Sequence, residues 1–550
     1  MSDIVPADLV LTGGVVHTVD AARSRARAVA VRGGRIVAVG SERDGARHIG
    51  PKTRVVPLDG RMLIPGFQDA HIHPIGGGLG RSRCDLHEAE GRDAYLAIVA
   101  EYARAHPDRP WIDGSGWSMD DFPGGTPQRA DLDAIVPDRP VFITNRDGHG
   151  AWVNSRALAV AGIDRDTPDP RDGRIERDTA GEPTGMLQEG AADLVQRQVP
   201  RDTPADLEDG LRVAQAYLHS LGITAWQDAI VTPDEFRTYA AFAERGELTA
   251  RVVGALWWDR DRGEEQIEEL KDSRSRGPIG RFAATSVKIM QDGILENFTG
   301  GMVEPYLNAS GNPTTNRGLS FVDPERLRSY VSRLDAEGFQ VHFHAIGDRA
   351  VREALDAVAA AREANGWTDG RHHISHIQVI QPSDVPRFAE LGVAANAQPY
   401  WACNEGQMTN LTLPFLGPVR STWQYPFRSL RRAGAVLAMG NDWSVSTPNP
   451  LLEIEVAVTR IADRTRGQAP PFLPEEALDV TDALAAFTIG SAWVNHLDRE
   501  TGTIETGKAA DLAVLDRDIL APNAGHIGDA RVLLTLVEGV PVFEDAALGA

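Results

Sequence analysis

Cysteine is nearly absent from this chain. Only Cys84 and Cys403 occur among 550 residues, which argues against a disulfide framework or a cysteine-rich zinc site and fits a reducing cytoplasm. The N-terminus lacks the basic start and apolar stretch of a signal peptide, and no apolar run is long enough to cross a bilayer. A cytoplasmic protein that is neither exported nor inserted into a membrane is therefore expected.

Basic residues are outnumbered by acidic ones, 56 against 78. The formal net charge is −22 at pH 7, which argues against a nucleic-acid partner because phosphate binding needs a basic surface. Neither a glycine-rich dinucleotide fingerprint nor a Walker A sequence occurs. These absences favour a small-molecule substrate as the partner, with no membrane involved, and a homodimer is a possible assembly.

Short apolar runs alternate with helical patterns along most of the sequence. Eight runs have the length of β-strands, and they lie at residues 62–73, 222–228, 251–257, 285–291, 339–344, 373–379, 393–398 and 435–442. Asp323 followed by Pro324 is typical of a helix start, and Gly338 of its end. Strand and helix alternating eight times predict an α/β fold, a distorted (β/α)8 TIM barrel. An open doubly wound sheet is the competing topology, and no nucleotide-binding motif supports it.

Two long interruptions do not fit a minimal barrel. Residues 75–213 follow the first strand and are too many for a structureless loop, so we expect a folded insertion that includes a strand at residues 140–144. A second, glycine-rich and asparagine-rich segment covers residues 293–323. Both follow strand C-termini, which places them over the mouth of the barrel, where such enzymes bind substrates.

The two ends of the chain resemble each other. Gly13-Gly14 and Gly33-Gly34 predict two β-hairpins near the N-terminus, and further strands are expected at residues 511–515, 532–537 and 540–543. Small sheets at opposite ends of a chain are marginal unless they pack together. We therefore predict a composite β-sandwich domain from residues 1–60 and 501–550, beside a barrel over residues 61–500.

Polar residues stand at the ends of the predicted barrel strands. Because all these ends face one rim, residues far apart in the sequence should converge there. The predicted metal-binding set is His71, His73, Lys288, His344, His376 and Asp442. Imidazoles and a carboxylate form a site suited to Zn²⁺, with Mn²⁺, Fe²⁺ and Co²⁺ as competitors, and one or two ions are compatible with it.

Lys288 is one of only four lysines in a chain that otherwise uses arginine. It is flanked by Val287 and Ile289, and a buried lysine shifts toward the neutral, nucleophilic amine. Reaction with CO₂ would convert it to a carbamate, an anionic ligand that can bridge two metal ions. The alternative is a lysine paired with Asp292 or another carboxylate.

Several motifs together resemble the amidohydrolase superfamily, and specifically its YtcJ-like branch, which includes N-substituted formamide deformylases. The motifs lie at residues 65–73, 342–348, 376–378, 440–443 and 502–514, and residues 147–155 of the insertion are similar to a motif of the branch. The resemblance implies a metal-dependent hydrolase on a distorted (β/α)8 barrel with a composite β-sandwich. It also implies that the predicted histidines and Asp442 hold the metal or its water, and that Lys288 is carboxylated.

A mechanism follows from these parts. Asp442 is the expected general base, and His149 in the insertion would polarise the scissile carbonyl unless it is only a turn residue. His342 is expected one layer deeper in the barrel than His344. His372 and His373 compete with His376 for the place at the rim, which His376 takes as the residue nearer the strand end.

Aromatic residues near the predicted mouth favour an apolar or aromatic substrate group. The residues expected to contact substrate are Trp152, Phe298, Tyr400 and Trp443. The predicted reaction is hydrolysis of a non-peptide C–N bond, with an N-acyl or N-formyl amide as substrate. Cyclic amides, carbamates and ureas, and deamination or decarboxylation, are alternatives on the same scaffold. A catalytically silent metal-binding or regulatory protein is the alternative of another class.

Overall fold

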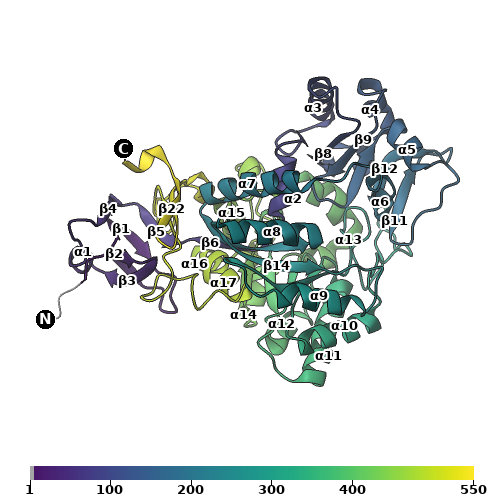
Figure 1. The fold of residues 1–550 in the computed structure, drawn as a ribbon. Coiled ribbons are helices and arrows are strands. Elements are labelled where there is room, and N and C mark those ends of the chain that lie inside the picture. Colours follow the sequence, from purple (N-terminus) through teal and green to yellow (C-terminus); the bar gives the residue numbers. More distant parts are fainter. Residues whose placement is uncertain (1–4, 550) are drawn as a thin grey trace.

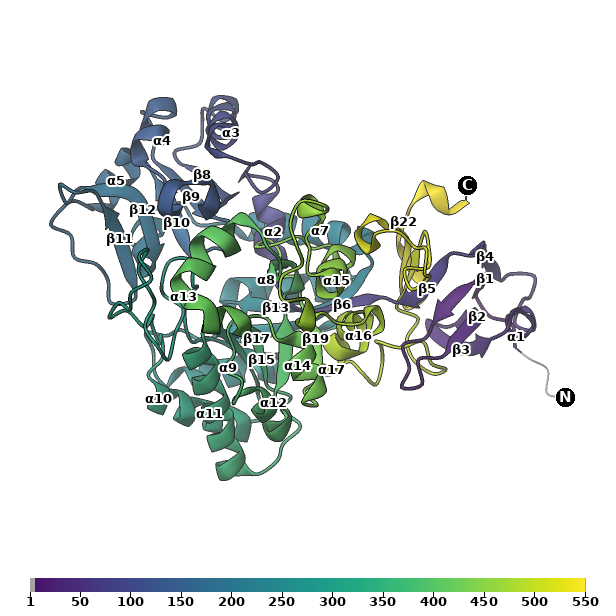
Figure 2. The same cartoon turned by 180° about the vertical axis from the view of Figure 1, so that it is seen from behind.

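Three β-sheets organise residues 5–549, which the computed structural model describes (Figure 1). A parallel eight-stranded sheet curves into a nearly closed barrel at the centre. A second eight-stranded sheet contains the strands from both ends of the chain, and a six-stranded sheet belongs to the insertion. The two outer sheets lie on opposite sides of the barrel, as both views show (Figures 1 and 2).

All eight predicted barrel segments form strands. In barrel order they are β6 (Phe67–Ile72), β13 (Ile223–Val231), β14 (Arg251–Trp257), β15 (Phe282–Met290), β16 (Gln340–Ala345), β17 (His373–His376), β18 (Ala394–Ala397) and β19 (Leu437–Met439). Each strand pairs in parallel with the next. The predicted α/β barrel is confirmed, and the open doubly wound sheet is excluded by this curvature and strand order.

Helices follow or separate these strands. Those around the barrel are α7 (Pro204–Ser220), α8 (Pro233–Arg245), α9 (Gln266–Ser275), α10 (Pro324–Ala336), α11 (Asp348–Asn365), α12 (Val385–Leu391), α13 (Leu413–Arg420), α14 (Phe427–Arg432), α15 (Pro450–Thr459), α16 (Val480–Ala485) and α17 (Ser491–Val494). Helix α10 begins as predicted, because the Asp323 carboxylate accepts hydrogen bonds from the backbone N–H groups of Glu325 and Arg326. Gly338, with φ +78°, follows its end.

The insertion folds around its own sheet and apolar core. Its strands are β7 (Cys84–Asp85), β8 (Ile112–Trp117), β9 (Val141–Asn145), β10 (Gly150–Val153), β11 (Gly173–Arg177) and β12 (Pro183–Glu189). Its helices are α2 (Pro74–Gly80), α3 (Arg92–Ala105), α4 (Arg129–Ile135), α5 (Ser155–Ala161) and α6 (Gly190–Gln196). Strand β9 matches the strand expected at residues 140–144. Residue 213, the expected end of the insertion, lies within α7, whose apolar face packs into the core of the barrel.

The outer sheet from the two termini is continuous. It comprises β1 (Leu9–His17), β2 (Arg25–Arg32), β3 (Arg35–Gly40), β4 (Arg54–Pro57), β5 (Met62–Pro65), β20 (Leu512–Leu515), β21 (Val532–Val537) and β22 (Val540–Glu544), with the short helix α1 (Glu42–Ala46) beside it. One buried cluster contains leucines from both ends of the chain. Strand β5 pairs with β1 on one side and β20 on the other, then leads through Gly66 into β6. The composite sheet is therefore confirmed, and it anchors the strand that carries His71; the limits at residues 60 and 501 stay a prediction.

One of the two predicted hairpins is wrong. Gly33-Gly34 joins β2 to β3, but Gly13-Gly14 lies inside the single strand β1, at a bulge. The strand pairs with β4 before the two glycines and with β5 after them. A Cβ atom on Gly14 would lie 2.4 Å from the Arg61 carbonyl oxygen, so close backbone approach, not a turn, requires glycine there.

The helices have no membrane-spanning character. Among the described residues, no helix combines the length and apolarity that a crossing requires.

The composite core generates a stability prediction. Leu534 of β21 is fully buried in it, whereas Val540 of the neighbouring β22 is 62% exposed. Leu534→Ala should lower the free energy of unfolding by about 2–5 kcal/mol, because it removes buried methyl groups and leaves a cavity. Val540→Ala should change it by no more than about 0.5 kcal/mol. Denaturant unfolding of both variants would measure this, and equal effects would contradict the shared core.

Candidate metal centre

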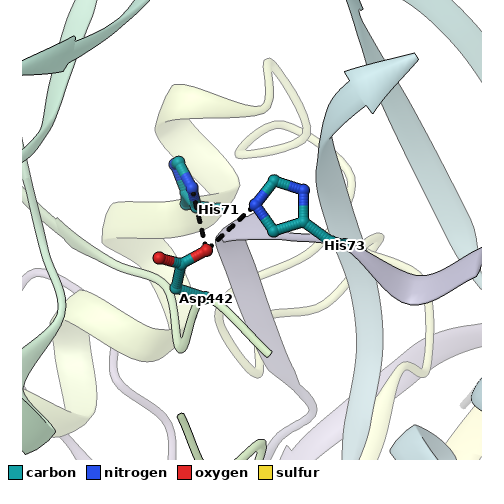
Figure 3. A group of neighbouring side chains, drawn as sticks. All are labelled: His71, His73 and Asp442. Carbon is teal, nitrogen blue, oxygen red and sulfur yellow. Dashed lines mark ion pairs between the residues drawn. The ribbon is translucent and has the colours of Figure 1, made fainter. Parts of the chain in front are cut away.

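The barrel closes at His71, His73 and Asp442. Both histidine Nε2 atoms lie close to one Asp442 oxygen, Oδ1, at 3.2 Å for His71 and 3.0 Å for His73 (Figure 3). Candidate ligand atoms of the three residues all lie within 4.8 Å of one another. His71 is the next-to-last residue of strand β6, and His73 directly follows the strand. The strand therefore directs both rings toward the segment after β19.

Backbone contacts hold these residues in register. The Asp69 carboxylate accepts hydrogen bonds from the backbone N–H of His71 at 2.9 Å and of Asn441 at 3.1 Å. The Asp442 N–H donates to the His71 carbonyl oxygen at 2.9 Å. A Cβ atom on Gly440 would lie 2.5 Å from the His71 nitrogen. The first and last barrel strands therefore meet where the candidate ligands lie.

The donor atoms present fit a divalent ion. His71 Nδ1 is engaged by His342 Nε2 at 2.7 Å and by the Ser375 hydroxyl at 2.9 Å, while His71 Nε2 is buried without a hydrogen-bond partner. The same is true of His344 Nδ1 and His376 Nδ1. Buried polar atoms without partners are costly. Nitrogen and carboxylate donors, with one imidazole oriented through its other nitrogen, form a set that fits a divalent ion such as Zn²⁺.

The remaining predicted ligands surround this group. The ring centroid of His376 lies 4.7 Å from that of His71 and 4.4 Å from that of His344. His376 Nδ1 is 3.9 Å from Asp442 Oδ2. Lys288 is buried and, with these residues, lines the same cavity. The structure thus brings all six predicted residues together.

Lys288 does not form the alternative ion pair. Among the described residues, no carboxylate oxygen lies within 4.0 Å of its Nζ. Asp292 instead accepts backbone hydrogen bonds from Gly301, Ile346 and Gly347 and lies 3.2 Å from His344 Nδ1. Burial lowers the pKa of Lys288 to about 7, despite the opposing charge of Asp442. A large fraction of the amine is therefore neutral near pH 7.

Burial also determines the charge of the other groups. It lowers the pKa of His71, His344 and His376 well below the usual value, so these rings are neutral at pH 7, as metal ligation requires. For Asp442, burial alone would raise the pKa, but interactions with neighbouring residues, the hydrogen bond with His73 first among them, outweigh it and lower the pKa. A carboxylate among neutral imidazoles results.

The other barrel histidines are engaged elsewhere. His342 lies one layer deeper, as predicted, and bonds to His71. His373 Nε2 lies 3.0 Å from the Gln227 amide oxygen, inside the barrel. His372 Nε2 lies 2.9 Å from Asp335. Only His376 of the three competing residues reaches the rim group.

A cavity of about 1150 Å³ opens above the rim. Tyr400 and Trp443 line it, as expected of substrate contacts. Trp152 and Phe298 lie elsewhere. Trp152 is fully buried in the core of the insertion, where its indole N–H donates to the Gln128 carbonyl oxygen. Phe298 packs against Tyr306 and Phe415 with centroid distances of 5.4 and 4.9 Å. Trp152 fills this apolar core and the half-buried Phe298 packs against it, which aromatic residues do as readily as they line a mouth.

The insertion contributes His149 to the cavity. Its ring centroid lies 5.4 Å from that of His344, and its Nδ1 lies 3.0 Å from both oxygens of Glu189. Burial disfavours the charged ring, but the Glu189 carboxylate outweighs it and raises the pKa of His149 to about 9. Sequence reasoning missed the roles of Glu189 and Asp69, and it considered Asp292 only as a partner of Lys288, not as a neighbour of His344. Asp292 and Asp69 each lie within four residues of a predicted ligand, which was the available signal, whereas nothing in the sequence linked Glu189 to His149.

Comparison with known proteins extends this picture. The sequence profile of the amidohydrolase family matches residues 54–543. The chain is 32% identical to Protein LONG AFTER FAR-RED 3 of Arabidopsis thaliana, over 98% of this chain and 92% of that protein. It is 31% identical to the putative amidohydrolase YtcJ of Bacillus subtilis, over 97% of this chain and 98% of the relative.

Two further similarities concern activity. The chain is 28% identical to an N-substituted formamide deformylase of Arthrobacter pascens, over 98% of each chain. The crystal structure of an uncharacterized metal-dependent hydrolase from Pyrococcus horikoshii superposes with a TM-score of 0.73 at 25% identity. The match covers 94% of this chain and 99% of the other.

The cluster predicts metal dependence residue by residue. His71→Ala and His73→Ala should each lower zinc affinity by more than the roughly 10–100-fold that loss of an outer hydrogen-bond partner costs. His87→Ala is the matched control, because His87 lines the same cavity but is engaged by Asp85 at 2.6 Å. Zinc titration and elemental analysis would measure this. Unchanged zinc affinity in both cluster variants would contradict the site.

Proposed function

This chain belongs to the amidohydrolase family and is a metal-dependent hydrolase, and from that premise we propose that it cleaves an amide C–N bond of a small organic substrate. The observation that carries the proposal is the group of His71, His73 and Asp442 at the floor of a large cavity. A buried carboxylate beside neutral imidazoles is suited to activating water.

The metal and Asp442 have complementary roles. His71, His73, His344 and His376, with Asp442, would hold the ion. When bound, a divalent ion supplies Lewis acidity, which makes a water nucleophilic near neutral pH and polarises a carbonyl oxygen. Asp442 accepts the proton of the attacking water and passes it to the nitrogen of the leaving amine, so the C–N bond breaks to give an acid and a neutral amine.

His149 supports the reaction from the insertion. Its Nδ1 is committed to Glu189, and its pKa of about 9 makes the ring a cation at neutral pH. The other nitrogen, Nε2, then donates a hydrogen bond to the carbonyl oxygen of the substrate. Negative charge grows on that oxygen as water adds, so this hydrogen bond is strongest in the transition state.

Lys288 is proposed to be carboxylated. Its buried amine, in large part neutral near pH 7 and with no carboxylate oxygen of the described residues within 4.0 Å, can add to the carbon of CO₂ and lose a proton, which leaves a carbamate anion. That anion would add an oxygen ligand to a site whose other donors are imidazoles and a single carboxylate.

The substrate is proposed to be an N-acyl or N-formyl amide with an apolar or aromatic substituent. Tyr400 and Trp443 line the cavity and offer apolar faces. The relative named as an N-substituted formamide deformylase, which matches over 98% of each chain, supports a formyl amide as the first candidate. Cyclic amides, carbamates and ureas are the competing substrates on the same scaffold.

A substrate panel tests this assignment. Metal-free protein should be inactive, and protein reloaded with Zn²⁺ or Mn²⁺ should convert N-(2-phenylethyl)formamide to formate and 2-phenylethylamine, as measured by mass spectrometry. N-butylformamide is the matched control for the aromatic contacts and should react with a higher KM. Turnover of only a cyclic amide, carbamate or urea would shift the substrate class, and no metal-dependent turnover of any compound would refute the proposal.

In the same assay, Asp442→Asn should lower kcat by about 10²–10⁴-fold, because the proton acceptor is lost, while most of the metal is retained on the imidazoles. An active Asp442→Asn enzyme would refute the assigned base.

Carboxylation of Lys288 predicts a dependence on bicarbonate. Metal uptake by wild-type protein should rise when bicarbonate is present during reloading, because the carbamate adds a ligand. Lys288→Met, which keeps the length and apolar stem of the side chain, should show no such rise. Elemental analysis with and without bicarbonate gives the comparison, and the same uptake by wild type under both conditions would argue against the carbamate.

A further inference from the structure

A clasp between the insertion and the barrel lies beside the candidate metal centre. It consists of His149 in the turn between β9 and β10, Glu189 at the end of β12, and Asn297 and Thr299 in the segment that follows β15. His149 and Glu189 also face each other through their backbones, because the Glu189 N–H donates to the His149 carbonyl oxygen at 2.9 Å. The clasp joins two parts of the chain that are more than 100 residues apart.

Hydrogen-bonding contacts with three residues hold the Glu189 carboxylate beside His149. Oε1 accepts hydrogen bonds from the Thr299 hydroxyl at 2.6 Å and from the Asn297 amide at 2.9 Å. Both carboxylate oxygens lie 3.0 Å from His149 Nδ1. The Glu189 side chain is only 5% exposed. A carboxylate with this many partners has little freedom to rotate.

Two backbone features accompany this placement of the Glu189 carboxylate. Glu189 has φ +51° and ψ −132°, a conformation uncommon for a residue other than glycine. At Gly293 the chain after β15 approaches so closely that a Cβ atom would lie 2.3 Å from Glu189 Oε1. A residue in an uncommon backbone conformation and a glycine packed against the Glu189 carboxylate and the Thr299 hydroxyl indicate that the position of this carboxylate is tightly constrained.

We infer that Glu189 is a positioning residue for catalysis, which fixes the His149 ring with Nδ1 toward the insertion and Nε2 toward the cavity. This inference rests on the proposed function for what Nε2 contacts, the carbonyl oxygen of the substrate. A histidine held by a carboxylate on one nitrogen presents the other in a defined direction. The raised pKa of His149 agrees with this ion pair.

Positioning of His149 by Glu189 would mean that the insertion does more than lie over the mouth of the barrel. The barrel supplies the predicted metal-binding residues, and the insertion supplies a fixed imidazole. Asn297 and Thr299 connect that imidazole, through Glu189, to the segment after the strand of Lys288, so the two halves of the site are built as one unit.

A double-mutant cycle tests the inference. Glu189→Gln and His149→Asn should each lower kcat on N-(2-phenylethyl)formamide by about 10²–10³-fold, the usual cost of losing one donor to the developing oxyanion, with little change in KM. The kcat of the double variant should be no more than about threefold below that of the less active single variant, because both changes remove the same interaction. Gly293→Ala, which crowds the Thr299 hydroxyl and the Glu189 carboxylate without changing any charge, should reproduce the loss in wild type and add little to His149→Asn.

A matched control separates positioning from stability. Asp335 and His372 form a pair at 2.9 Å that is even more deeply buried and does not line the cavity. Asp335→Asn should lower the melting temperature but leave kcat nearly unchanged, and its effects should add to those of His149→Asn. A Glu189→Gln enzyme that behaves like Asp335→Asn, with lost stability and normal kcat, would overturn the inference.

A second measurement does not depend on turnover. Acetohydroxamate presents a carbonyl oxygen and a metal-binding hydroxyl, and its binding to zinc-loaded protein can be followed by calorimetry. Glu189→Gln and His149→Asn should weaken it by the same factor, about tenfold or more, as expected for a charged hydrogen bond. Wild-type protein that binds the hydroxamate but hydrolyses no amide would refute the proposed function alone. Equal binding by wild type and Glu189→Gln, or no binding by wild type, would overturn the positioning role.

Discussion

The closure of the barrel is the constraint on which the site depends. Strand β6 is the first in the barrel and β19 the last, and hydrogen bonds from His71 and Asn441 to the Asp69 carboxylate join them. The Asp442 N–H bonds directly to the His71 carbonyl oxygen. Because the seam and the candidate metal ligands use the same residues, a barrel that failed to close would also separate the imidazoles from the carboxylate.

The sheet formed by the two ends of the chain stabilises this seam from one side. Strand β5 lies between β1 and β20 and continues through Gly66 into β6, so the two ends of the chain hold the strand that carries His71. A Cβ atom on Gly66 would lie 2.4 Å from the Thr224 side chain. The close approach at this residue couples the composite sheet to the barrel.

The insertion completes the site from the other side. Its turn carries His149, and its strand β12 ends at Glu189, which reaches the segment after β15. The same insertion buries Trp152 in its own core. A folded insertion can hold His149 rigidly because it has its own sheet and apolar core, which a flexible loop of the same length lacks.

Much of the fold was predictable from local patterns. The eight strands of the barrel could be predicted, because buried parallel strands are short apolar runs bounded by turn residues. Gly13-Gly14 misled because glycine serves a bulge as well as a turn, and only the pairing of β1 with β4 and β5 distinguishes them. Trp152 and Phe298 misled because an aromatic side chain suits a core and a binding site equally.

The sequence by itself determined the order of strands and helices and the ligand types at the strand ends. It follows that His71, Lys288, His344, His376 and Asp442 share one rim, since parallel barrel strands end on one face. Only the tertiary structure decided which nitrogen of His71 is free, that Lys288 lacks a carboxylate partner, and that Glu189 faces His149. These depend on contacts between segments far apart in the chain, and residue spacing carries no information about them.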